Sequence, residues 1–251
     1  MKDNIVNATP KMLLGGMSGV SSVQHLVTLK TWMASKKQLK SECIFQVFDM
    51  EKFFDKESLL DCMYTLDKKA NIDQKCYRIW YKLNEDARIS VKTSVGESKR
   101  SFVKDSIGQG SGGAALVYSL NCAIEDTFQN QASTKIGNIG LNSLCFQDDI
   151  SKLNDNLNEA RRGCSLIHET LAQKQLSINN DKCKYLIIGR PAYRNKVLLE
   201  TSKTFLEMGG KTIEHSEKEK YLGDIIHEKG CVESIMETIK ERTRKLISKC
   251  D

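Results

Sequence analysis

The chain has 251 residues, of which 40% are hydrophobic and 28% are charged, and its formal net charge is +6. This composition is typical of a folded protein with one substantial core and excludes an intrinsically disordered chain. No apolar run reaches the roughly 18 residues of a membrane helix, and residues 1–10 lack the apolar stretch of a secretory signal. We therefore expect an intracellular protein that is neither secreted nor membrane-bound.

The cysteines exclude two further classes of protein. There are nine of them, an odd number, and no two are spaced as in a zinc site. A disulfide scaffold and a zinc knuckle are therefore not expected, and we interpret the cysteines as reduced, mostly buried apolar residues. The mild positive charge would suit a phosphate-bearing partner but does not by itself indicate one.

The first predicted elements are a strand and two helices. Residues 44–48 are short, apolar and rich in β-formers, and they stop at Asp49. They predict a buried strand that ends in a carboxylate. Apolar residues at intervals of three and four then predict one amphipathic helix over 59–66 and a second over about 72–83.

A strand pair and a glycine-rich turn follow. Residues 88–93 and 101–107 predict two strands joined through Gly96. Four glycines within 108–113 predict a flexible turn, and the apolar residues 114–124 continue with helical spacing.

The second half of the chain begins with a predicted hairpin. Residues 141–147 predict a strand that ends at Asp148-Asp149, and residues 150–153 can return antiparallel to it. A helical stripe over 157–171 follows, in which Asn156 and Glu159 resemble a capping box. Further strands are predicted at 184–188, 204–208 and 221–226, and a final helix has an apolar side formed by Val232, Ile235, Met236, Ile239 and Leu246.

The aspartates carry the strongest chemical signal. Two separate strands are predicted to end in acids, at Asp49 and at Asp148-Asp149, and one sheet could bring these ends together. Such a cluster is unfavourable unless cations neutralise it, and Mg²⁺ binds through a few carboxylates plus substrate phosphates. The pattern therefore favours metal-assisted phosphoryl transfer, in which one ion activates the attacking hydroxyl and another stabilises the leaving group.

These motifs also have other interpretations. An Asp-Asp pair in a turn is usually turn chemistry and surface solvation. A phospho-accepting receiver domain also uses an acid pair and a further aspartate, but there the pair comes first, whereas here Asp49 precedes it. The glycine turn lacks the spacing of a Walker loop, so it is either a helix entry or a different kind of site.

Several segments, in this order, resemble the motifs of reverse transcriptases, particularly those of non-LTR retrotransposons. They are residues 15–29 before the first palm motif, the palm motif at 48–55, a Gln-Gly motif at 107–111, the aromatic-x-Asp-Asp hairpin at 146–149, residues 176–179 with Lys182, and Tyr221-Leu222-Gly223. The departures from the family pattern, such as Gln147 where alanine is commoner, remove none of the expected ligands.

The resemblance implies a catalytic role for four residues. Asp49 and Asp148 would be the firm ligands of two Mg²⁺ ions, with Mn²⁺ as an alternative, and Asp149 would be a supporting ligand. Lys182 would lie near the triphosphate and could act as a general acid.

It also implies binding roles. Phe54 would exclude a ribose 2′-hydroxyl, and Gln109 and Gly110 would lie against the incoming nucleotide and the template. Tyr221, Leu222 and Gly223 would support the primer end.

The implied fold is an α+β polymerase palm, with an antiparallel sheet covered by helices on one face in a split βαβ arrangement like that of ferredoxin. The implied division is a remnant of the fingers at 1–42, the palm at 43–190, and the end of the palm with a helix leading to the thumb at 191–251.

Two functions remain open at this point. The first is an RNA-directed DNA polymerase that extends a DNA primer with dNTPs on an RNA template, in the nucleus or the cytoplasm. The second is a catalytically inactive retrotransposon-derived fragment that at most binds nucleic acid.

Overall fold

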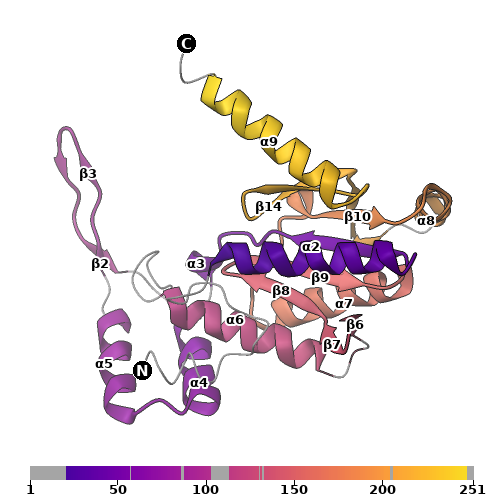
Figure 1. Ribbon diagram of the computed structural model, residues 1–251. Coiled ribbons are helices and arrows are strands. Elements are labelled where there is room, and N and C mark those ends of the chain that lie inside the picture. Colours follow the sequence, from indigo (N-terminus) through magenta and orange to yellow (C-terminus); the bar gives the residue numbers. More distant parts are fainter. Residues whose placement is uncertain are drawn as a thin grey trace.

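The computed structural model describes residues 21–56, 58–85, 88–102, 113–129, 131, 133–203 and 206–247 (Figure 1). The glycine turn expected at 108–113 therefore lies almost entirely outside the described residues. A five-stranded sheet, in the order β13-β10-β1-β9-β8, forms the centre of the molecule.

The central strand of this sheet is β1 (Cys43–Phe48), all of whose residues are buried. It pairs antiparallel with β10 (Lys184–Ile188) and with β9 (Asp149–Asn154), and β9 pairs antiparallel with β8 (Ser143–Phe146). The short edge strand β13 (Glu214–His215) runs parallel to β10. The predicted antiparallel sheet is confirmed for every other pair of neighbouring strands in it.

Two long helices connect the strands on one face. Along the chain, α6 (Gly113–Phe128) comes after β1 and before β8, and α7 (Leu157–Gln173) connects β9 to β10. With α4 (Leu59–Ala70) they form the larger hydrophobic core, which includes Ile44 and Phe48 of β1. The strand order and these crossings confirm the split βαβ arrangement.

The opposite face of the sheet is also covered, so the expectation of helices on one face is wrong. α2 (Ser22–Gln38), a helix that was not predicted, packs its buried side with Leu29 and Trp32 against Phe45 of β1 (Figure 1). The indole N–H of Trp32 donates to Thr134 Oγ1 at 2.9 Å, which fixes the helix on a neighbouring hairpin. Because alternate residues of β1 point to opposite faces and all of them are buried, the strand requires cover on both faces.

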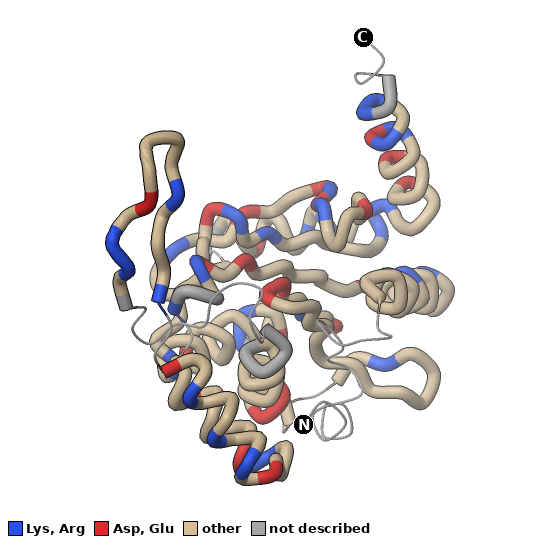
Figure 2. The backbone as a smooth tube through the Cα atoms, turned by 90° about the vertical axis from the view of Figure 1, so that its left-hand side faces the viewer, with Lys and Arg blue, Asp and Glu red and all other residues tan. Residues whose placement is uncertain are grey.

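Other predicted elements are present with shifted ends, and residues 103–107 of the strand expected at 101–107 lie outside the described residues. They are α5 (Gln74–Glu85), which follows α4, the hairpin of β2 (Arg88–Ile89), β3 (Lys92–Thr93), β4 (Gly96–Glu97) and β5 (Ser101–Phe102), and the helix α9 (Cys231–Ile247). The hairpin stands away from the body of the molecule and carries basic residues on both of its strands (Figure 2).

Four elements in the second half differ from the predictions. No helix was predicted after the strand at 184–188, but Pro191 opens α8 (Pro191–Lys203), because proline suits the first position of a helix. The strand expected at 141–147 is divided between β7 (Ile139–Leu141), which pairs with β6 (Thr134–Ile136), and β8.

The strand expected at 221–226 contains a turn. It joins β14 (Lys218–Tyr221) to β15 (Asp224–His227). The strand expected at 204–208 is reduced in the described residues to β11 (Glu207–Met208), which pairs with β12 (Lys211–Thr212). In the first half of the chain, a short helix α3 (Phe53–Lys56) follows β1.

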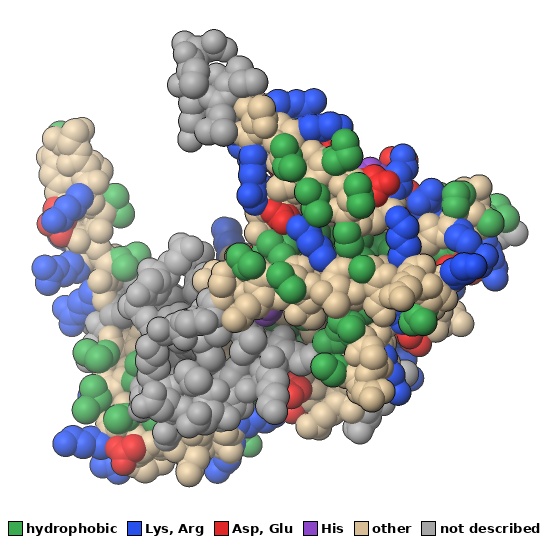
Figure 3. Space-filling view, viewed as in Figure 1, with side chains coloured by type: hydrophobic (Ala, Val, Ile, Leu, Met, Phe, Trp, Pro, Cys, Tyr) green, Lys and Arg blue, Asp and Glu red, His purple; other side chains and the backbone are tan. Residues whose placement is uncertain are grey.

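The apolar side of α9 does not face the core. Val232, Ile235, Met236 and Ile239 are 47–63% exposed (Figure 3). The buried side is polar instead: Ser234 Oγ accepts from the backbone N–H of His227 at 2.8 Å, and Thr238 Oγ1 accepts from that of Ile225 at 2.9 Å. The hydroxyl groups of α9 thus accept hydrogen bonds from backbone N–H groups of β15.

The cysteine prediction is confirmed for the described residues. The eight cysteines there are all free, and six of them are buried. Among the described helices, none is long and apolar enough to cross a membrane.

The capping box of α7 is confirmed, and it gives a test of the fold. Asn156 Oδ1 accepts from the backbone N–H of Glu159 at 3.0 Å, and Glu159 Oε2 accepts from that of Asp155 at 2.9 Å. Asn156→Ala should lower the free energy of unfolding by about 1 kcal/mol, because it leaves a helix N–H without its acceptor.

Chemical denaturation measures this change. Asn158→Ala, an exposed position in the same helix, is the matched control and should be neutral or slightly stabilising. Equal effects of the two substitutions would show that the cap does not stabilise the helix.

Candidate functional site

The antiparallel register of the sheet brings the predicted acidic strand ends together. Phe48 of β1 pairs with Ile150 of β9, so one further step places Asp49 beside Asp149. Phe146 pairs with Asp149 across the hairpin, and Gln147 and Asp148 form the two-residue turn. Thus the three aspartates lie at one end of the sheet.

The surroundings of Asp149 change its pKa. Burial, which is the largest cause, and the negative charges of Asp148 and Asp49 together raise the pKa of Asp149 to about 6. Asp149 therefore holds its proton more firmly than an ordinary aspartate. A nearby cation would relieve the repulsion from the two neighbouring charges.

Lys182 also reaches this end of the sheet. It lies just before β10, on the other side of β1, and its Nζ is 3.4 Å from Asp49 Oδ2. The lysine side chain is 65% exposed, so it is free to meet a ligand while it neighbours the carboxylate. The structure thus brings together all four residues expected to act in catalysis.

Backbone contacts hold the Lys182 segment beside the end of β1. The N–H of Asn179 donates to Asp49 O at 2.9 Å, and the N–H of Glu51 donates to Ser177 O at 2.9 Å. Lys56, which the sequence did not single out, donates to Glu51 Oε2 at 2.8 Å and to Ser177 Oγ at 2.9 Å. These bonds extend the sheet by a short ladder that fixes the main chain around Asp49.

The expected primer-supporting residues lie at the turn between β14 and β15. Leu222 and Gly223 both have positive φ, 48° and 88°, as a tight hairpin turn requires, although this conformation is uncommon for leucine. Tyr221 is buried, and its ring meets that of Phe45 edge-on at 5.5 Å.

A hydrogen bond connects this turn to the strand of the acids. The hydroxyl oxygens of Tyr221 and Ser151 are 3.1 Å apart, and the Ser151 hydroxyl also donates to Leu144 O at 3.0 Å. Ser151 is two residues from Asp149. It was missed from the sequence because a single serine inside an apolar strand carries no pattern.

The remaining expected site residues cannot be placed. Gln109 and Gly110 lie outside the described residues. Phe54 belongs by its backbone to α3, but its side chain is outside the described part.

The donor set suits a hard divalent cation. Carboxylate oxygens are the ligands that Mg²⁺ prefers, and Mg²⁺ needs only one or two of them beside water and substrate phosphates. The negative charges of Asp148 and Asp49 contribute to the raised pKa of Asp149, and a bound cation would offset that contribution. Within the described ranges, however, no three His, Cys, Asp or Glu side chains converge closely enough to hold an ion by themselves.

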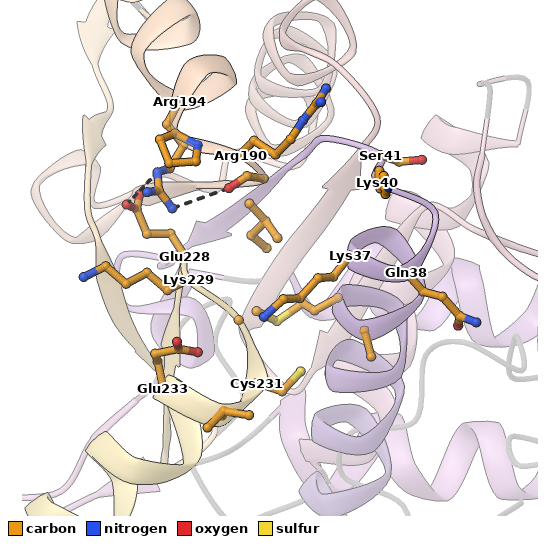
Figure 4. Close-up of a pocket in the computed structure, with 17 residues that line it drawn as sticks. Lys37, Gln38, Lys40, Ser41, Arg190, Arg194, Glu228, Lys229, Cys231 and Glu233 are labelled. Carbon is orange, nitrogen blue, oxygen red and sulfur yellow. Dashed lines mark hydrogen bonds and ion pairs between the residues drawn. The ribbon is translucent and has the colours of Figure 1, made fainter.

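A pocket of about 710 Å³ lies at the other end of the sheet (Figure 4). It is lined by the end of α2, by the turn after β10 and by the start of α9, and it includes Lys37, Arg194 and Glu228. Since Cys43 pairs with Ile188 at that end, the length of β1, about 20 Å, separates the pocket from Asp49. The pocket is therefore not part of the carboxylate site.

The raised pKa of Asp149 predicts a pH dependence of stability. Because the folded-state pKa lies above the ordinary value of 3.8, the stabilisation from the bound proton is complete below about pH 4 and is lost as the pH rises through about 6. In the presence of a chelator, the melting temperature of the Asp149→Asn variant should therefore rise relative to that of the wild type as the pH increases from about 4 to about 7.

Thermal unfolding over this pH range, with Asp126→Asn as the control, measures the difference. Adding Mg²⁺ at about pH 7 should stabilise the wild type and reduce the difference in melting temperature between it and Asp149→Asn. A difference in melting temperature that stays constant with pH would contradict the raised pKa of Asp149.

Comparisons with known proteins agree with this geometry. Residues 4–226 match the family described as "Reverse transcriptase (RNA-dependent DNA polymerase)". No curated protein sequence matches the chain.

Among solved structures, apo telomerase from Candida tropicalis superposes with a TM-score of 0.57 at 12% identity, over 90% of this chain and 38% of that one. Telomerase from Candida albicans, in complex with a TWJ fragment of telomeric RNA, gives a TM-score of 0.53 at 10% identity, over 90% of this chain and 34% of that one. The chain thus spans little more than a third of these proteins, and at such identities the likeness concerns the fold. The match over 4–226, together with a palm-like sheet that carries the three aspartates at one end, shows that the chain belongs to the reverse transcriptase family.

Proposed function

We propose that the protein is an RNA-directed DNA polymerase that extends the 3′-hydroxyl of a primer with dNTPs on an RNA template. The observation that carries the proposal is the register of β1 against β9, which sets Asp49 beside Asp149 next to the Asp148 turn. In a chain of the reverse transcriptase family, this juxtaposition provides the carboxylates that nucleotidyl transfer requires.

Asp49, Asp148 and Asp149 are the residues that would hold the metal. Mg²⁺, or Mn²⁺ in its place, would stabilise charge on the attacking and leaving oxygens and on the transferred phosphoryl group. The half-buried positions of Asp148 and Asp149 leave these carboxylates within reach of a substrate. Asp49, whose main chain is fixed on both sides, supplies the rigid part of the site.

Lys182 would bind the triphosphate and could protonate the leaving pyrophosphate. Its exposed ammonium group beside Asp49 supports this role, because it can follow the substrate without losing contact with the site. Tyr221, Leu222 and Gly223 would support the primer terminus. The contact between Tyr221 and Ser151 would fix the position of this turn relative to the carboxylates.

RNA is proposed as the template for two reasons. The family description names an RNA-dependent DNA polymerase, and the Candida albicans telomerase structure contains a fragment of telomeric RNA. The narrower resemblance to the non-LTR retrotransposon type rests on the order of the sequence motifs. It is part of the proposal.

Primer extension on a homopolymer RNA template with Mg²⁺ and dNTPs tests the function. We expect extension by the wild type and a loss of at least about 100-fold for Asp148→Ala and for Asp49→Ala, because each removes charge stabilisation from the reacting oxygens. Asp126→Ala is the matched control, since Asp126 is an exposed aspartate at the end of α6 that pairs only with the exposed Lys69 among the described residues.

The alternative function gives a different result. A folded wild-type chain that binds the RNA template but extends no primer would be a catalytically inactive binding module. Extension that survives Asp148→Ala would place the chemistry elsewhere and would overturn the assignment of the site.

A further inference from the structure

The hairpin that runs from β2 to β5 is separate from the body of the molecule (Figure 1). Within 88–101, every side chain but one, the half-buried Ser90, is exposed, including the apolar Ile89, Val91 and Val95. Hydrogen bonds between its own strands hold it together. An isolated two-stranded ribbon is only marginally stable in water, so a binding partner would stabilise this one.

The hairpin contains a bulge that presents two basic residues. Ile89 pairs with Ser101, and the carbonyl of Val91 accepts from the N–H of Ser98 at 2.9 Å. One residue, Ser90, lies between these bonds on the first strand, and two residues, 99 and 100, lie between them on the second. A bulge of this kind bends the strand and redirects side chains.

The two redirected residues are Lys99 and Arg100, and both are exposed. Lys92, on the other strand, is exposed as well. None of these three cations has an ion-pair partner among the residues that the structure describes. The only acid within 88–102 is Glu97, which accepts a hydrogen bond from the Ser90 hydroxyl.

The spread of the cations indicates the kind of partner. Arg88 at the base and Lys92 near the tip are four residues apart on one strand, about 13 Å along the ribbon. A single small anion cannot meet charges so far apart, whereas a polyanion can. Serine and threonine hydroxyls between the cations are further donors for phosphate oxygens.

The position of the hairpin selects among polyanions. It faces α9 across open space in the ribbon and space-filling views (Figures 1 and 3). In the ribbon view α3, which follows the strand end at Asp49, lies near the foot of that space (Figure 1). The far end of α9 carries the exposed Arg244, and also Arg242, which pairs with Asp224 at 2.7 Å. A nucleic acid strand that crosses the carboxylate site would therefore pass between basic residues of the hairpin and of α9.

We infer that the hairpin is an arm that binds the phosphate backbone of the nucleic acid on the palm, through Lys92, Lys99 and Arg100. The inference rests on the proposed function for the identity of the ligand. It adds a part of the chain that no expected motif includes, and it concerns binding and not chemistry.

The test measures binding of a fluorescent RNA–DNA hybrid by anisotropy at several salt concentrations, without dNTPs. The arm variant carries Lys92→Gln, Lys99→Gln and Arg100→Gln. The matched control carries Lys37→Gln, Lys40→Gln and Lys229→Gln, which remove the same charge from exposed lysines around the pocket at the opposite end of the sheet (Figure 4).

The arm variant should bind on the order of tenfold more weakly at low salt, with a plot of log affinity against log salt about 2 to 3 units less steep than that of the wild type. The control should keep the wild-type slope. If the triple arm variant proves unstable in thermal unfolding, Lys99→Gln alone should still reduce the slope by about 1 unit.

An arm variant that binds the hybrid as the control does would overturn the inference. So would a loss of binding to phosphatidylserine vesicles with unchanged binding to the hybrid, because the arm would then serve a membrane surface. Failure of the proposed polymerase function is distinguishable, since it appears as absent primer extension by the wild type and leaves these binding slopes readable.

Discussion

The register of β1 between β9 and β10 is the constraint on which the rest of the structure depends. Successive residues of a strand point to opposite faces, so a slip by one residue would exchange the two faces of the sheet and separate the acidic ends. In the observed register Asp49 has Asp149 on one side and Lys182 on the other. Both hydrophobic cores, one below α6 and α7 and one below α2, follow from the same alternation along β1.

Buried polar side chains specify this register within an apolar sheet. Asn154 donates to Gln46 Oε1 at 2.8 Å and to Ile44 O at 3.2 Å, and Gln46 donates to Ala160 O of α7 at 3.2 Å. Gln46 and Asn154 are fully buried, so a shifted pairing would leave amide groups unsatisfied at a cost of about 1–3 kcal/mol each. Similarly, the buried Asp224 binds Lys30 of α2 and Arg242 of α9 at 2.6 and 2.7 Å, which fixes both helices around the β14–β15 hairpin.

Local patterns in the sequence were sufficient for the core of the palm and insufficient at its margins. Strands 44–48 and 184–188, the Asp148-Asp149 hairpin and the capped helix after Asn156 have clear periodicity, and each is present. α2 and α8 were missed because their apolar residues do not form a sharp stripe, and α9 was misjudged because its buried side is polar. The contact of Tyr221 with Ser151 joins residues 70 positions apart, which no local pattern reveals.

If the register forms one site for divalent cations from Asp49, Asp148 and Asp149, the protein should bind Mn²⁺ through these three carboxylates. Electron paramagnetic resonance of Mn²⁺, titrated into the full chain with a non-hydrolysable dNTP analogue, counts bound ions directly. We expect bound Mn²⁺ that is displaced by Mg²⁺ and is lost in Asp49→Asn and in Asp149→Asn, while Asp126→Asn binds as the wild type does. Binding that survives both of the first two substitutions in folded protein would contradict this expectation.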